Sequence, residues 1–243
     1  MYILKKIKFL FILLISSIIM TSCSTSIIDY NKEGMAFCKN GKYDEAIKKF
    51  EKGIELDHKN YYLYNNKGFA LLQEEKIDEA ITCFDEAIKI NEKKTDAYSN
   101  KGLALDKKGK YKDAIELCDK AIELDSSNEE AYMNKGHALL KLEKYNDAVS
   151  YFNFALKIKE NDPNAYFNKA NALYKMGKYI DAIQNYKKTL ELNLRSTDVY
   201  YNLGLAYAKN GDKDKAIQSF KSDLELNPND EMAKTSLDVL LNQ

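Results

Sequence analysis

The sequence predicts an all-α protein, and three observations lead to this fold class. The 243 residues include only two prolines and no tryptophan, while Lys, Glu, Ala, Leu and Ile are abundant. Such a composition favours helices and contains few residues that interrupt them. An apolar fraction of 45% is sufficient for a buried core. Finally, one residue pattern recurs every 34 residues along most of the chain.

The recurring pattern consists of two amphipathic segments separated by a short turn. The first segment reads YNKEGMAF, YNNKGFAL, YSNKGLAL, YMNKGHAL, YFNKANAL and YYNLGLAY, starting at residues 30, 64, 98, 132, 166 and 200. The second is exemplified by GKYDEAIKKFEKGIELD from Gly41. Each repeat therefore predicts a helix, a turn and a second helix. The six repeats are 27–60, 61–94, 95–128, 129–162, 163–196 and 197–230.

The turn and the start of the second helix have their own signals. A left-handed residue that ends the first helix is predicted at Gly41, Gly109, Gly177 and Gly211. N-capping residues of the second helix are predicted at Asp44, Asp78, Asn146 and Asp214.

The repeated residues of the first helix predict how the helices pack. At 100° per residue, Tyr98, Gly102 and Leu105 share a face that should contact the second helix of the same repeat. Ala104 has an alanine counterpart in all six repeats and should contact the preceding repeat. Lys101 should lay its stem along this packing and keep its charge in water.

A last helix is predicted at 231–243. It should cap the stack with Leu237, Leu240 and Leu241 turned inward and with Lys234 and Asp238 in water.

A 34-residue helix-turn-helix repeat of this pattern resembles the tetratricopeptide repeat. In the third repeat the residues at the family's positions are Tyr98, Gly102, Leu105, Ala114, Cys118, Ala121 and Ser126. Departures are Ala170 in place of a glycine and a closing proline only at Pro228. The resemblance implies an α-α superhelix, a solenoid of six repeats plus the capping helix. It also implies that the first helices line a concave groove that binds a peptide or protein partner.

The candidate groove residues lie on the first-helix face that neither packing contact uses. An asparagine recurs there as Asn66, Asn100, Asn134, Asn168 and Asn202. Around it are Tyr62, Phe69, Leu103, Met133, His137, Phe167, Tyr174 and Tyr201. A carboxamide both donates and accepts, so a row of them suits the backbone of an extended peptide. The alternative is that duplication copied an asparagine with only a local structural role.

A lysine row borders the same face, at Lys39, Lys107, Lys141, Lys175 and Lys209. Its position in the last turn of each first helix is explained by the helix dipole, which favours a cation there. The lysines and asparagines of a carboxylate clamp for chaperone tails are not in place, so that ligand is not expected.

The first 26 residues predict export and anchoring. Lys5, Lys6 and Lys8 precede an apolar run at 9–20 that is too short for a membrane span but suits a signal peptide. The following TSC resembles the lipobox of bacterial lipoproteins, which implies removal of 1–22, a lipid on Cys23 and a spacer at 23–26. An ordinary signal peptide and an uncleaved anchor are the alternatives. The expected location is the cell envelope, at the outer membrane where there are two membranes.

Charge and composition exclude several classes of function. Lys and Arg total 37, against 37 Asp and Glu, so no basic excess would attract nucleic acid. Three cysteines after Cys23 indicate neither a disulfide framework nor a metal site. Only His58 and His137 are present, in different repeats, and neither belongs to a catalytic pattern. No cofactor, metal or catalysis is expected.

Together these features predict a membrane-anchored, non-catalytic scaffold or adaptor with a protein or peptide partner. Two alternatives remain open: an assembly factor for a secretion or pilus pore, like lipid-bearing pilotins, and an accessory subunit of a cell-envelope enzyme.

Overall fold

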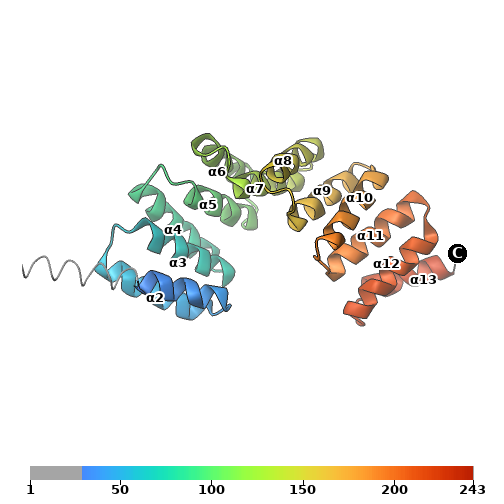
Figure 1. Cartoon of the computed structure of the whole chain (residues 1–243), viewed down its shortest axis with the longest axis horizontal. Coiled ribbons are helices and arrows are strands. Elements are labelled where there is room, and N and C mark those ends of the chain that lie inside the picture. The colour runs from blue at the N-terminus through green and yellow to red at the C-terminus, as the bar shows by residue number, and fades with distance from the viewer. Residues whose placement is uncertain (1–28, 243) are drawn as a thin grey trace, which may run out of the picture. The chain divides into compact units, whose positions relative to one another are not determined.

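The computed structural model describes residues 29–242, and within this range it contains helices and no strand, as predicted (Figure 1). Residues 29–39 are helical. The following helices are α2 (Tyr43–Leu56), α3 (Tyr61–Gln73), α4 (Ile77–Ile90), α5 (Asp96–Lys107), α6 (Tyr111–Leu124), α7 (Glu129–Lys141), α8 (Tyr145–Ile158), α9 (Pro163–Lys175), α10 (Tyr179–Glu191), α11 (Thr197–Asn210), α12 (Lys213–Leu226) and α13 (Glu231–Leu241).

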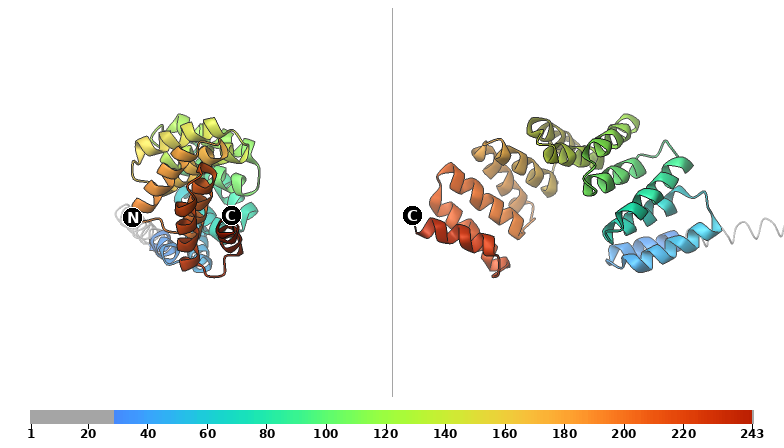
Figure 2. Two further views of the ribbon diagram at one scale, coloured as in Figure 1. Left: turned by 90° about the vertical axis from the view of Figure 1, so that its right-hand side faces the viewer. Right: turned by 180° about the vertical axis from the view of Figure 1, so that it is seen from behind.

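The chain forms two compact units, a first unit that ends at Gly109 and a second that begins at Lys110. In each unit, helices that follow one another in sequence pack side by side (Figures 1 and 2). First helices of consecutive repeats also contact one another: α3 with α5, α7 with α9, and α9 with α11. Each unit therefore gathers its first helices on one face.

The glycine of the first helix allows close contact with the second helix of the same repeat, as predicted. A Cβ atom placed at Gly68 would lie 2.6 Å from Cε1 of Phe84, and one at Gly136 would lie 2.6 Å from Cε1 of Phe152. Both phenylalanines are fully buried. Any side chain at these glycines would therefore overlap an aromatic ring.

The recurring alanine lies at the contact with the preceding repeat. It is fully buried at Ala70, Ala104, Ala138, Ala172 and Ala206. Ala104 belongs to the cluster that contains Cys83 and Phe84 of the preceding repeat. Ala36, at the same place in the first repeat, is exposed. The sequence prediction for this alanine is confirmed.

The turns between the two helices of a repeat are left-handed, as predicted. Gly41, Gly109, Gly177 and Gly211 have φ values of 69°, 79°, 74° and 87°. In the two repeats without this glycine, Glu75 and Glu143 adopt the same conformation, with φ of 59° and 60°. A residue with a Cβ is strained there.

The predicted N-caps of the second helices are wrong. α2 begins at Tyr43 and is preceded by Lys42, whose side chain forms no capping hydrogen bond. The residues Asp44, Asp78, Asn146 and Asp214 are instead the second residues of α2, α4, α8 and α12. Inside the first turn, the three aspartates interact favourably with the positive end of the helix dipole.

Lysines on the first helices form ion pairs with the preceding repeat, and for Lys101 this adds a partner that the sequence prediction did not name. Lys67 Nζ lies 2.8 Å from Glu51, and Lys101 and Lys135 pair in the same way with Asp85 and Asp119. The Lys101 ammonium is thus held by a carboxylate. Sixteen residues separate the two members of each pair, so the pair spans the repeat junction at a fixed place.

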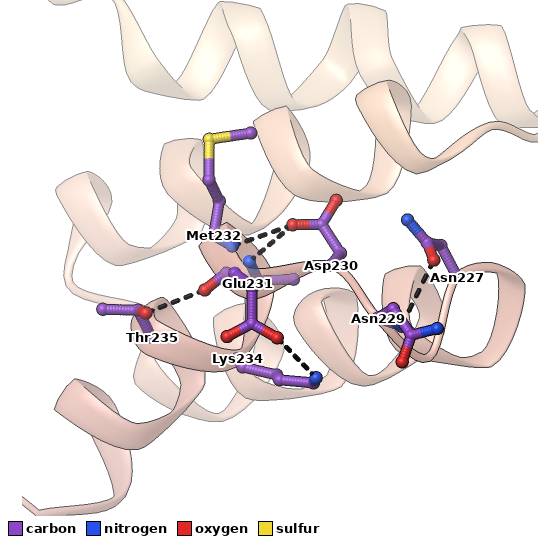
Figure 3. Close-up of polar contacts among 8 residues, drawn as sticks. Asn227, Asn229, Asp230, Glu231, Met232, Lys234 and Thr235 are labelled. Carbon is purple, nitrogen blue, oxygen red and sulfur yellow. Dashed lines mark hydrogen bonds and ion pairs between the residues drawn. The ribbon is translucent and has the colours of Figure 1, made fainter.

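The C-terminal helix α13 is only partly as predicted. Ala233 is fully buried and Leu237 and Leu240 are half-buried, but Leu241 is 57% exposed, so its predicted inward position is wrong. Lys234 pairs with Glu231 at 2.8 Å, and Asp238 is exposed. The side chain of Asp230 caps the helix by accepting from the backbone N–H groups of Met232 and Ala233 (Figure 3).

The predicted signal peptide 1–22, the lipid site Cys23 and the spacer 23–26 lie outside the described residues. From residue 29 to 242, no helix has both the length and the apolar character needed to cross a membrane.

Candidate functional site

The predicted groove residues lie on first helices, and nearly all are half-buried. This holds for Asn66, Asn100, Asn134, Asn168, Asn202, Phe69, Leu103, Met133, His137, Phe167, Tyr174 and Tyr201. Tyr62 differs, with 49% of its surface exposed. Its hydroxyl accepts a hydrogen bond from Lys94 Nζ at 2.9 Å.

In the first unit the recurring asparagines, Asn66 and Asn100, are bonded to other asparagines of the first helices. Asn66 Nδ2 donates to Asn31 Oδ1 at 2.9 Å, and Asn100 Nδ2 donates to Asn65 Oδ1 at 3.1 Å. A bond of 3.4 Å from Asn65 Nδ2 to Asn66 Oδ1 joins the two pairs. The four carboxamides thus form one chain across three repeats. In this unit the asparagine row links the repeats, which favours the structural role left open by the sequence.

The second unit has a different polar centre, built around Asn171 on α9. Its Oδ1 accepts from Tyr186 Oη on α10 at 2.6 Å and from Asn202 Nδ2 on α11 at 3.2 Å. Burial raises the pKa of Tyr186 above its ordinary value, so the hydroxyl stays protonated and donates. The Nδ2 group of Asn171 and Oδ1 of Asn202 are unbonded within residues 29–242. The amide group of Asn171 and the carbonyl oxygen of Asn202 are thus a donor and an acceptor without a partner in this range.

This centre lies in a pocket of about 390 Å³. Three consecutive first helices contribute to it, so it follows the face that the sequence predicted. Its lining residues are Leu140 and Lys141 of α7, Glu143 and Tyr145, Asn171, Tyr174 and Lys175 of α9, Tyr186, and Asn202 and Leu205 of α11. Leucine and tyrosine side chains provide apolar walls around a few polar groups, as in many ligand sites.

The other aromatic residues of the predicted groove also pack against the core. The rings of Phe167 and Tyr186 are 6.0 Å apart, and those of Tyr201 and Phe220 are 5.7 Å apart. Met133 packs against the cluster around Phe152. These side chains therefore help to stabilise their own repeats.

The pocket combines a basic rim with a single acidic residue. Lys141 and Lys175 lie in the last turns of α7 and α9, as predicted. Neither forms an ion pair in the described range, and Glu143 is the one acidic residue of the lining. A metal has no comparable place, because residues 29–242 hold no cluster of His, Cys, Asp and Glu suited to one.

Sequence reasoning missed Asn171 and Tyr186. Asn171 takes the place held by Phe69, Leu103, His137 and Leu205 in other repeats, and Tyr186 takes the place of phenylalanine in four of them. Both departures occur in the fifth repeat, and their side chains bond to each other. The sequence signal for this pair is that two residues depart from the repeat pattern within the same repeat. A prediction drawn only from the residues that recur does not select them.

Family models identify these repeats. The model described as TPR repeat matches residues 34–74, 70–109, 136–177 and 170–211. The model described as tetratricopeptide repeat matches 95–128 and 197–230, the bounds of the third and sixth predicted repeats. No curated protein gives a significant match to the sequence.

Solved structures share the fold. "Crystal structure of APC/C hetero-tetramer Cut9-Hcn1" matches with a TM-score of 0.83 at 19% identity over 88% of this chain, which spans 43% of that one. PilF of Pseudomonas aeruginosa has a TM-score of 0.77 at 18% identity, covering 91% of this chain and all of its own. YrrB, described as a TPR protein with an unusual peptide-binding site, has a TM-score of 0.61 at 25% identity over 78% of this chain and 97% of its own.

Because the family models cover well over half of the sequence, and because the helix pairs and their glycine and alanine contacts follow the repeat, this chain belongs to the tetratricopeptide repeat family.

Proposed function

We propose that this protein is a membrane-anchored lipoprotein and a non-catalytic scaffold that binds a peptide or protein partner on the first-helix face of its second unit. The pocket around Asn171 carries the proposal. It offers an amide donor, an amide acceptor and apolar walls on one surface, which suits a peptide group and a neighbouring apolar side chain. The peptide-binding site named for YrrB supports the same class of partner.

The first unit has a lesser part in this proposal. Its asparagines use their amide groups to bond to one another, so fewer of them remain for a backbone. Two or three new hydrogen bonds at a net ~1 kcal/mol each would not offset the ~4–15 kcal/mol cost of association. Apolar contacts with Leu140, Leu205 and Tyr174 must therefore supply most of the affinity.

A crosslinked pull-down from the native host tests the site. The pocket variant carries Asn202→Ala and Leu205→Ala, and the control carries Ile180→Ala, a residue of α10 that is 62% exposed and does not line the pocket. We expect the pocket variant to lose the proteins recovered with the wild type and the control to keep them. Equal recovery by both variants, with unchanged circular dichroism, would sink the proposal.

The lipid anchor is tested separately. Metabolic labelling with palmitate should mark the wild type and Cys38→Ala, whose thiol is buried, but not Cys23→Ala. Label that persists in Cys23→Ala would contradict anchoring through this cysteine.

A second candidate is an assembly factor for a pilus or secretion pore. It is favoured by the match to PilF and to PilW, the latter described as a type IV pilus biogenesis factor, over 100% and 98% of their lengths. At 18% and 19% identity this likeness concerns the fold. Loss of pili in a deletion strain, restored by the wild type, would select this role.

A further inference from the structure

The last repeat has a buried carboxyl group at a position where the earlier repeats have none. Asp223 of α12 is fully buried, and neither of its carboxylate oxygens has a hydrogen-bond partner in the described part of the chain. An ionised carboxyl group without a partner is costly to bury, because it loses its hydration and gains nothing in return.

The repeat register shows what Asp223 faces. Its place is held in the earlier repeats by small residues, Gly53, Ala87, Ala121, Ala155 and Thr189. A Cβ atom at Gly53 would lie 2.8 Å from Cδ2 of Leu63, ten residues later on the next first helix. Ten residues after Asp223 is Ala233, the fully buried residue of α13, and α12 packs against α13. Asp223 therefore lies beneath α13.

The charges around Asp223 oppose its ionisation. Asp198 of α11 and Asp230 at the start of α13 both face it with negative charge. Asp230 caps α13, and Lys234, the one lysine of α13, pairs with Glu231 and not with Asp223 (Figure 3). Burial, with smaller contributions from Asp230 and Asp198, raises the pKa of Asp223 from 3.8 to about 6.

The helix that covers Asp223 is held weakly. Ala233 is the one fully buried residue of α13. Met232, Val239 and Leu241 of the same helix are 62%, 51% and 57% exposed. Little apolar area therefore opposes the separation of α13 from α12, so a change in one buried charge can shift the balance.

We propose that Asp223 is a proton-controlled latch for α13. The helix docks firmly on α12 when the carboxyl group carries a proton, and ionisation of Asp223 loosens it. Opening uncovers the side of α12 that corresponds to the side covered by the next first helix in earlier repeats. This device is independent of the pocket around Asn171 and of any partner bound there.

The sign and size of the effect follow from linkage. Docking raises the pKa of Asp223, so the docked form binds a proton more tightly than the open form does. Docking is therefore strongest at low pH and weakens as the pH rises through about 6. Each pH unit between the ordinary pKa and the raised pKa changes the docking equilibrium constant by a factor of ten. About one such unit lies above pH ~5, so the constant should fall about tenfold between pH ~5 and ~8.

Amide hydrogen exchange of the full chain tests the latch, with rates corrected for intrinsic exchange at each pH. We expect protection of α13 amides to fall about tenfold from pH ~5 to ~8, while α11 amides change much less. Two variants remove the charge: Asp223→Asn, and Asp223→Ala, which introduces the alanine that the second repeat has at this position (Ala87). In both, protection of α13 at pH ~8 should rise and its pH dependence should vanish. Asp238→Asn, an exposed carboxyl group on α13, should behave like the wild type.

Two results would overturn the proposal. One is α13 protection that is the same at both pH values in the wild type. The other is a pH dependence that survives unchanged in Asp223→Asn and Asp223→Ala. Because no partner is needed, neither result bears on the proposed binding function.

Discussion

At the scale of single residues, the fold depends on positions where a side chain would not fit. The glycine of the first helix faces an aromatic ring of the second helix, and the contact recurs at Gly34, Gly68, Gly136 and Gly204. The fifth repeat instead pairs Ala170 with Tyr186, whose ring therefore already accommodates a methyl group. The same place is thus tight in one repeat and relaxed in another.

The variant Gly136→Ala should destabilise the protein. Its Cβ would meet the Phe152 ring at 2.6 Å, and overpacking of about 1–3 kcal/mol should exceed the gain in helix propensity of ~1 kcal/mol. The free energy of unfolding from urea titration measures the change. The control Ala170→Gly should lose only about 1 kcal/mol, the propensity term. A Gly136→Ala variant more stable than the wild type would refute the close contact.

The variant Glu75→Gly should stabilise the protein. Glu75 has a φ of 59°, where a residue with a Cβ is strained by roughly 1–2 kcal/mol and glycine is not. After the entropy cost of glycine, a gain of about 0.5–1 kcal/mol should remain in the free energy of unfolding. The neighbouring Glu74 has a φ of −83°, so Glu74→Gly should bring no gain. Equal effects of the two changes would argue against the left-handed turn.

Residue type and period predicted these packing positions, but the hydrogen bonds of the asparagines could not be predicted in the same way. The period places Asn66 and Asn100 on one face, yet the partner of each depends on how far the repeats are rotated against one another. That rotation brings Asn31 within bonding distance of Asn66, and Asn65 within bonding distance of Asn100. In the second unit, Asn171 stands where other repeats have an apolar residue or histidine, and Asn202 donates to its Oδ1 atom. Such pairing is a property of packed helices.

At the scale of helices, ion pairs fix the junctions between repeats. Lys67, Lys101 and Lys135 each reach a carboxylate on the preceding second helix. The corresponding residue of the fifth repeat is Lys169, and the residue sixteen positions before it is Asn153, which carries no charge. Burial lowers the pKa of Lys169. The junction between the fourth and fifth repeats thus retains the lysine without its carboxylate partner.

Restoring that partner with Asn153→Asp should stabilise the junction. The new carboxylate would pair with the half-buried Lys169, and a gain of about 0.5–1 kcal/mol in the free energy of unfolding is expected at low salt. The gain should vanish in a Lys169→Met background, which completes a double-mutant cycle. A gain that persists without the lysine would show that the pair is not its cause.

Helix existence and length could be predicted from the sequence more firmly than helix ends. The 34-residue period and the apolar spacing locate both helices of each repeat. Capping was mispredicted because Asp44 and its counterparts have the residue type of an N-cap but lie two positions after the N-cap. The chain enters α2 through Lys42, directly after the left-handed Gly41, and the Lys42 side chain forms no capping hydrogen bond.

At the scale of the whole molecule, the sequence divides into a predicted anchor and a repeat array with only a small net charge. If residues 1–22 are removed as the sequence predicts, Lys5, Lys6 and Lys8 leave with them and the remaining chain carries 34 basic and 37 acidic residues. Long-range steering by charge is therefore weak. We therefore expect recognition of a partner to depend on local shape and contact, and the proposal above assigns this role to the pocket around Asn171.

The most direct test of this account is site-specific photocrosslinking in the native host. A photoreactive amino acid is placed at Leu205, which lines the pocket, and in a matched variant at Ile180, which is exposed on α10 away from it. The account predicts a discrete adduct with a partner from Leu205, reduced by Asn171→Ala, and none from Ile180. Adducts from Ile180 alone, or equally from both positions, would contradict a partner bound on the first-helix face.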